Sequence, residues 1–239
     1  MNNIEGCKLQ LRIETNKKLI AKELISDVIP ALRLDDDGQK ALSWMEIFRI
    51  SHLPVVDNHQ YLGLISDKSI YDLNLIDKKM VDCQEVLLQA HVHSTQHIYE
   101  VVSVVSELKL SLVPVLDLKH AYVGVVSVMD LSMKFADLVA VHEPGGILVL
   151  ELNPIDYSLA QIAQIVEGND AKILSLYIHK EKDSKEIIVT IKVNQVDLSS
   201  LIQTFMRYDY SIKAVFMDES VINNMYDDRF DQLMKYMNI

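Results

Sequence analysis

The feature that most constrains the fold is a pattern that occurs twice, sixty residues apart. The first copy reads Ser51-His-Leu-Pro-Val-Val-Asp57 and then Tyr61-Leu-Gly-Leu-Ile-Ser66. The second reads Ser111-Leu-Val-Pro-Val-Leu-Asp117 and then Tyr122-Val-Gly-Val-Val-Ser127. A repeat at this period indicates one supersecondary unit used twice. A chain of 239 residues has room for such a pair and one further small domain.

Each copy predicts the element order β-α-β-β-α. An amphipathic helix precedes a strand that contains a proline, and a polar turn leads to a second strand that contains a glycine. A unit of about sixty residues buries too little surface to be stable alone, so we expect the two copies to share one core. The predicted helix faces are Ala41, Leu42, Met45 and Phe48 in the first copy, and Ile98, Val101, Val102, Val105 and Leu108 in the second. The predicted second helices span 67–75 and 128–138.

This duplicated pattern resembles the CBS domain over roughly residues 22–140, and CBS pairs usually form a compact module with two clefts and often dimerise. The resemblance predicts an α+β chain with a CBS-pair module. The expected parts are a leader at 1–21, CBS repeats at 22–80 and 81–141, a linker at 142–146, an ACT-like domain at 147–217 and a terminal helix at 218–239.

The resemblance implies an adenine nucleotide in one or both clefts, with AMP, ATP or S-adenosylmethionine as candidates and no required cofactor. The family signature is Gly-x-x-Ser/Thr-x-x-Asp, in which the hydroxyl begins a helix whose free N–H groups favour a phosphate. The Asp accepts hydrogen bonds from the ribose. The second copy keeps the signature, whereas the first has Ser69 in place of the Asp. The predicted nucleotide-binding residues are Ser127, Asp130, Gly124, Pro114, Ser66 and Lys68.

A structural interpretation of the same residues stays open. Ser127 followed by Asp130 also reads as a helix N-cap with an acidic residue at its third position, which stabilises a helix start without any ligand.

After the Pro144-Gly-Gly146 cluster the pattern becomes βαββαβ, which is the ferredoxin-like order. Strands are expected at 147–152, 172–180, 187–193 and 211–216, with Asn153 or Asp156 capping the first helix. This part resembles the ACT domain, whose ligand loop contains a glycine that 151–156 lacks. We therefore favour a dimerising sheet without a ligand. The order of domains is similar to acetoin utilisation regulatory proteins of bacteria.

The rest of the sequence offers no strong sign of catalysis. A net charge of −11 argues against nucleic acid or anionic membrane as partners, and the two cysteines make neither a disulfide framework nor a zinc site. No apolar run approaches the length of a spanning helix, and no signal peptide is evident. We interpret His91, His93 and His97 as solvated loop histidines, with zinc binding as the alternative, and 35–38 as a helix-capping turn.

The sequence thus predicts a cytoplasmic, homodimeric regulatory protein without enzymatic activity that binds a nucleotide in its CBS pair. Two alternatives remain. One is a dimerisation or interaction scaffold that binds no ligand, and the other is a hydrolase that uses the cleft and the region of His91 and His93.

Overall fold

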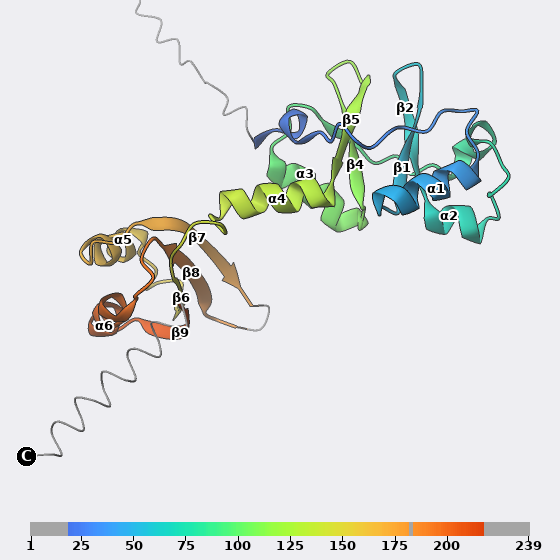
Figure 1. Ribbon diagram of the computed structural model, residues 1–239. Helices are drawn as coiled ribbons and strands as arrows, with labels where there is room; N and C mark the ends of the chain where they lie inside the picture. Colours follow the sequence, from blue (N-terminus) through green and yellow to red (C-terminus); the bar gives the residue numbers. More distant parts are fainter. Residues whose placement is uncertain (1–18, 182–183, 218–239) are drawn as a thin grey trace, which may run out of the picture. The chain divides into compact units, whose positions relative to one another are not determined.

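The computed structural model describes residues 19–181 and 184–217, drawn as coloured ribbon in Figure 1. The chain divides into two compact units, Met1–Lys134 and Phe135–Ile239. The division falls inside helix α4 (Val128–Leu138), ahead of the linker predicted at 142–146. Most of the predicted leader and all of the terminal helix predicted at 218–239 lie outside the described residues.

Unit 1 contains two copies of one structural repeat, and their hairpins stand side by side in Figure 1. In each copy a helix precedes an antiparallel hairpin, and a second helix follows the hairpin directly. The bridge between Gln60 and Ala121 joins the two hairpins near their turns. The first copy consists of α1 (Gly38–Phe48), β1 (His52–Asp57), β2 (Gln60–Ser66) and α2 (Asp67–Asp72). The second consists of β3 (Val92–His93), α3 (Ile98–Leu108), β4 (Leu112–Leu116), β5 (Tyr122–Ser127) and α4.

The backbone repeats in detail. Leu32 forms a parallel bridge with Val55, and Val92 pairs in parallel with Val115, so both partners shift by the same sixty residues. The hairpin register is interrupted just after Val55 in one copy and just after Val115 in the other. The predicted β-α-β-β-α order is therefore confirmed, with the first strand of the first copy reduced to the single bridge at Leu32.

The segments that precede each copy cross to the other copy. The 3₁₀ helix η2 (Ala21–Leu24) leads to Ser26, whose N–H donates to the carbonyl of Val125 at 2.8 Å. The 3₁₀ helix η3 (Met80–Val86) leads to Leu88, which exchanges two hydrogen bonds of 2.9 Å with Leu64. Each hairpin thus hydrogen-bonds to a segment that belongs, in sequence, to the other predicted repeat. The predicted boundary between residues 80 and 81 divides the chain in sequence order and does not separate these pairs.

The first helix of each copy begins at a side-chain cap. The Asp37 carboxylate accepts from the backbone N–H of Lys40 at 2.8 Å, which confirms the capping interpretation of 35–38. His97 caps α3, and the Glu100 carboxylate accepts from the His97 N–H at 3.2 Å to complete a capping box. Buried side chains, among them Ala41, Met45, Ile98 and Val101, turn the inner faces of these helices toward the core.

Unit 2 is a four-stranded antiparallel sheet in the order β7-β8-β6-β9, with α5 and α6 on the same side of it in Figure 1. This is the predicted βαββαβ topology of an ACT-like domain. Leu148, Ile191 and Phe205 lie in the core between the sheet and the helices. The elements are β6 (Ile147–Leu152), α5 (Leu159–Glu167), β7 (Ile173–Lys180), β8 (Ile187–Val193), α6 (Ser199–Arg207) and β9 (Ser211–Phe216).

The cap of α5 differs from the expectation. Ser158, not Asn153 or Asp156, accepts from the backbone N–H of Gln161 at 3.3 Å. A cap must stand directly before the first helical residue, and here that residue is Leu159. Asn153 and Asp156 instead close a turn in which the Asp156 N–H donates to the Asn153 carbonyl.

Candidate functional site

Two of the residues predicted to hold a nucleotide, Ser127 and Asp130, lie at the N-terminus of α4. Ser127 ends β5 and is buried, and its hydroxyl donates to the Asp130 carboxylate at 2.5 Å. The backbone N–H of Asp130 donates to the Ser127 hydroxyl at 3.1 Å, and the Ser127 N–H reaches the same carboxylate at 3.3 Å. This is a reciprocal capping box, so the capping interpretation describes the chain as it stands. The same groups are the ones that the CBS signature would present to a phosphate and a ribose.

The first copy has a cap of the same geometry with different chemistry. Ser66 ends β2, and its hydroxyl accepts from the Ser69 N–H at 3.0 Å. The two hydroxyls lie 2.8 Å apart. Because a hydroxyl has one oxygen, Ser69 cannot accept two ribose hydrogen bonds as a carboxylate does.

A cavity of about 390 Å³ opens beside the cap of the first copy. Its size lies in the range of small-molecule sites. It is lined by His52, Leu64, Ser66, Ser69 and the crossing segment 85–88. By the symmetry of the repeat, the equivalent position in the second copy is bounded by Ser127, Asp130 and the crossing segment near Ser26.

The other predicted contacts are placed as follows. Pro114 is buried in β4 opposite Val125 of β5. Lys68 is exposed in the first turn of α2. At Gly124 an added Cβ would stand 2.5 Å from the side chain of Ile25, so the absence of a side chain here allows the crossing segment to pack closely against β5. Gly63 admits Leu87 in the same way, which gives both glycines a packing role.

A small polar joint connects the two copies. The Ser51 N–H donates to the Ser111 hydroxyl at 3.0 Å, and the Nδ1 atom of His52 lies 3.1 Å from the same oxygen. Burial lowers the pKa of His52, and the nearby Asp67 carboxylate opposes this in part. The joint thus links the starts of β1 and β4, and any change in the packing of the pair must alter it.

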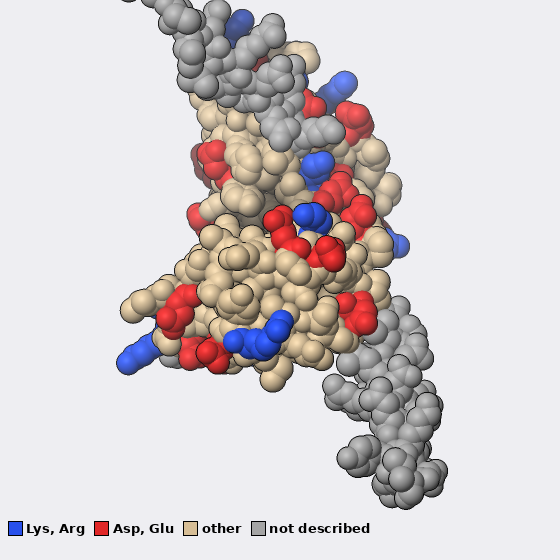
Figure 2. Space-filling view, turned by 90° about the vertical axis from the view of Figure 1, so that its left-hand side faces the viewer, with Lys and Arg blue, Asp and Glu red and all other residues tan. Residues whose placement is uncertain are grey.

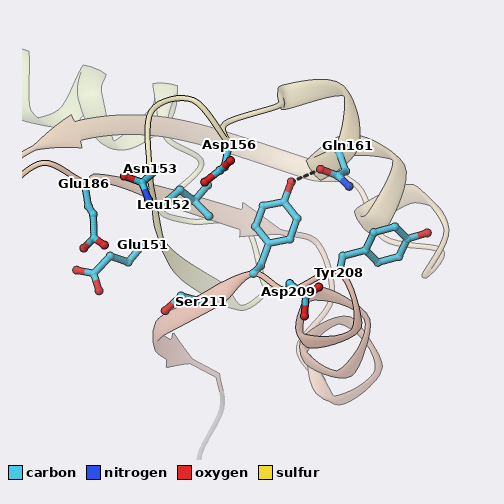
Figure 3. Close-up of a pocket in the computed structure, with 10 residues that line it drawn as sticks. Glu151, Leu152, Asn153, Asp156, Gln161, Glu186, Tyr208, Asp209 and Ser211 are labelled. Atoms are coloured by element: carbon cyan, nitrogen blue, oxygen red, sulfur yellow. Dashed lines mark hydrogen bonds between the residues drawn. The ribbon is translucent and has the colours of Figure 1, made fainter.

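Unit 2 has a cavity of about 600 Å³ beside the loop that corresponds to the ACT ligand loop, shown in Figure 3. Two of its lining residues are joined by a hydrogen bond that the Tyr210 hydroxyl donates to the Gln161 side chain at 2.9 Å. The carboxylates of Glu151, Asp156, Glu186 and Asp209 line the cavity. Lys213 pairs with Glu151 at 2.9 Å, and the described lining residues include no lysine or arginine that would hold the carboxylate of an amino acid.

The three histidines singled out from the sequence do not act together. His97 caps α3, whereas His91 and His93 lie next to His120, from the turn between β4 and β5. Their interpretation as solvated side chains is wrong for two atoms: Nδ1 of His91 and Nδ1 of His93 are buried and lack a hydrogen-bond partner. Sequence reasoning missed His120, because only the pairing of β3 with β4 brings it near.

The charged surface agrees with the negative net charge. On the face in Figure 2, the described Lys and Arg side chains lie among Asp and Glu and form no continuous basic patch. Within the described residues, no helix combines the length and apolar character needed to cross a membrane.

Residues 21–75 match the family model of the CBS domain. The chain therefore contains a CBS domain, and the internal symmetry of unit 1 gives that unit the arrangement of a CBS pair. The matched range begins at the crossing helix η2 and ends just after α2.

Comparison with solved structures finds a CBS domain pair/ACT domain protein from Thermotoga maritima, 18% identical, with a TM-score of 0.44, 50% of this chain covered and 98% of that chain. A Vibrio cholerae protein described as an acetoin utilization protein (AcuB) is 18% identical, with a TM-score of 0.45 and coverages of 52% and 95%. CBSX2, solved in complex with AMP, is 13% identical, with a TM-score of 0.41 and coverages of 50% and 97%.

Proposed function

We propose that this protein is a regulatory protein that senses an adenine nucleotide through its CBS pair. The observation that supports this most directly is the Ser127–Asp130 cap, a complete CBS signature at the start of an eleven-residue helix, in a chain with a CBS family match. CBS domains are known to bind adenine nucleotides, and CBS-pair proteins are generally regulatory and not catalytic. AMP, ATP and S-adenosylmethionine are the candidate ligands.

In the proposed complex, both members of the cap exchange partners. The Ser127 hydroxyl turns from the Asp130 carboxylate to a phosphate oxygen beside the first N–H groups of α4, where the helix dipole favours negative charge. The Asp130 carboxylate then accepts hydrogen bonds from the ribose hydroxyls. The hydrogen bonds lost within the cap are replaced by bonds to the ligand, so the exchange leaves no buried polar group unsatisfied.

We assign the tighter site to the second copy. The cavity at the first copy has Ser69 at the ribose position and Glu85 in its lining, and a carboxylate repels a phosphate. Lys68, exposed at the start of α2, is the cation that would offset this repulsion for a weaker second ligand. Pro114 and Gly124 position β4 and β5 in this proposal and make no polar contact with the ligand.

The regulatory output would come from a shift in the packing of the pair. A nucleotide that binds one packing more tightly than another increases the population of the first. The joint of Ser51, His52 and Ser111 is the place where such a shift would alter hydrogen bonds.

We place the protein in the cytoplasm as a homodimer, with the exposed Tyr177 and Phe216 on the sheet face away from α5 and α6 as its contact. Light scattering at two concentrations tests the dimer.

The decisive experiment is calorimetric titration of the full chain with AMP, ATP and S-adenosylmethionine. Asp130→Ala is expected to weaken binding by about 1.5–3 kcal/mol, the cost of losing a hydrogen bond to a charged group. Ser69→Ala, at the equivalent position of the first copy, is the matched control and should leave the tighter Kd unchanged. Circular dichroism of both variants checks that α4 and α2 still form.

The main alternative is a scaffold whose cleft binds nothing. It predicts no heat of binding with any nucleotide at millimolar concentration, and that result for the wild-type chain would overturn the proposal. A hydrolase that uses the cleft predicts slow turnover of ATP, which mass spectrometry of the titrated sample would detect.

A further inference from the structure

Three histidines of the second repeat converge at one point outside the nucleotide cleft proposed above. Each of His91, His93 and His120 offers a ring nitrogen, and these three atoms all lie within 4.8 Å of one another. The ring centroids of His91 and His93 are 5.5 Å apart, and those of His93 and His120 are 5.3 Å apart. No carboxylate or thiolate of the described residues belongs to the group.

The fold fixes this convergence. His91 and His93 stand two residues apart on extended chain, so their side chains share one face. The parallel pairing of His93 with Leu116 brings β3 alongside the end of β4, from which the turn with His120 continues. That turn is held in place because the Tyr122 N–H donates to the His59 carbonyl at 2.8 Å.

The imidazoles have unmet bonding capacity. Nδ1 of His91 and Nδ1 of His93 are both buried without a hydrogen-bond partner in the described structure. Orphaned buried polar atoms are uncommon and call for an explanation such as an ion or a water.

We propose that His91, His93 and His120 form a binding site for a transition-metal ion of the zinc type. Neutral imidazole suits Zn²⁺, Ni²⁺, Co²⁺ and Cu²⁺, whereas Mg²⁺ and Ca²⁺ require oxygen ligands that the group lacks. Zinc–nitrogen bonds of about 2.0–2.1 Å require the three nitrogens to draw closer together, by side-chain rotation within one local cluster. Three protein ligands leave a fourth position for water.

A bound ion would connect β3 to the turn between β4 and β5, in addition to the two-residue ladder that pairs β3 with β4. Metal binding therefore stabilises the second repeat selectively. Because the site shares no residue with the Ser127–Asp130 cap, its existence is independent of nucleotide binding.

The test uses the full chain without an affinity tag, stripped with a chelator and titrated with Zn²⁺ against a competing chromophoric chelator. Wild type is expected to bind one equivalent. His120→Asn should weaken binding by at least about 100-fold, since losing even a partner outside the ligand shell typically costs about 10–100-fold. His59→Asn, at the turn of the first hairpin, is the matched control and should bind as wild type does.

The two variants are chosen to preserve the fold. His120 has a φ of +62° and His59 a φ of +71°, and asparagine tolerates this region better than most residues. Co²⁺ substitution gives a second readout, since a four-coordinate site yields intense visible absorption that His93→Ala and His120→Asn should abolish. The proposal is overturned if wild type retains no metal against the competitor, or if His120→Asn and wild type bind equally.

Discussion

The two CBS repeats have the same backbone and different chemistry at the same place. Ser66 and Ser127 begin their second helices with equivalent hydrogen bonds, but the next cap position is Ser69 in one copy and Asp130 in the other. The joint is also unequal, since His52 in the first copy corresponds to Leu112 in the second. Close backbone packing fixes the strands and glycines of both copies, whereas the helix starts are free to diverge. In our proposal this difference makes the second copy the one that binds the nucleotide more tightly.

The largest expected effect concerns the two glycines that admit the crossing segments. Gly63→Ala should destabilise the protein by about 2–4 kcal/mol, because the residue has a φ of +145° and its Cβ would stand 2.6 Å from Leu87. Gly124→Ala should cost about 1–3 kcal/mol, because only the Ile25 side chain must move. Urea unfolding measures both. An equal loss for the two variants would show that backbone strain plays no part.

The second-largest loss of stability is expected from substitutions at the polar joint between the two copies. Ser111→Ala removes the acceptor of the Ser51 N–H and is expected to cost about 1–3 kcal/mol. Ser51→Ala keeps that backbone donor and should cost much less. Chemical denaturation of the two variants provides the comparison. If Ser51→Ala is as harmful as Ser111→Ala, the hydrogen bond described above does not stabilise the pair.

The helix caps are expected to have smaller effects on stability. Ser127→Ala and Ser66→Ala should each cost about 1 kcal/mol, the usual value for loss of an N-cap side chain. Ser132→Ala, on the exposed side of α4, is the control for serine removal within a helix. Thermal unfolding compares the three. A loss restricted to Ser127 would mean that the first cap contributes nothing in the short helix α2.

The smallest expected effect is a dependence of stability on pH, which arises from His52 at the joint and has no counterpart at Leu112. Burial lowers the pKa of His52 in the folded chain below 6.5, so protonation favours the unfolded chain. The stabilising contribution is complete above pH 6.5 and is lost as the pH falls through the folded pKa. His52→Asn, which keeps a polar δ atom, should flatten this decline. Denaturant midpoints between about pH 7.5 and 5.5 measure the decline of stability with pH. The same decline in His52→Asn and wild type would show that His52 does not cause it.

Local patterns in the sequence were sufficient to predict much of this fold. Pro-Val strands and Gly-x-x-Ser turns mark hairpins and helix starts within a few residues, so the repeat and the range of α4 were predictable. Alternation and turn residues likewise located β6, β8 and β9 at their observed bounds. The Ser127–Asp130 pair was predictable because its partners are three residues apart and their hydrogen bonds depend on one helix start alone.

Features that depend on distant parts of the chain could not be predicted in this way. The crossing of Ser26 to Val125 joins residues from different repeats, and no local motif marks it. His120 joins His91 and His93 only after β3 pairs with β4. The predicted cap of α5 was wrong because Asn153, Asp156 and Ser158 are all good capping residues. Which of them caps the helix depends on where the turn at 153–156 ends and the helix begins.

The crossing segments have a consequence for how this protein tolerates being cut. A deletion that ends near Ser26 would remove residues that complete β5, about one hundred positions downstream, while leaving the numbered start of the first repeat almost intact. Separation of the chain near residue 78 would remove from each hairpin the segment that hydrogen-bonds to it, so we expect neither half to fold alone. Because the segment before each repeat pairs with the hairpin of the other, we expect the pair, and not a single repeat, to be the smallest unit that folds alone.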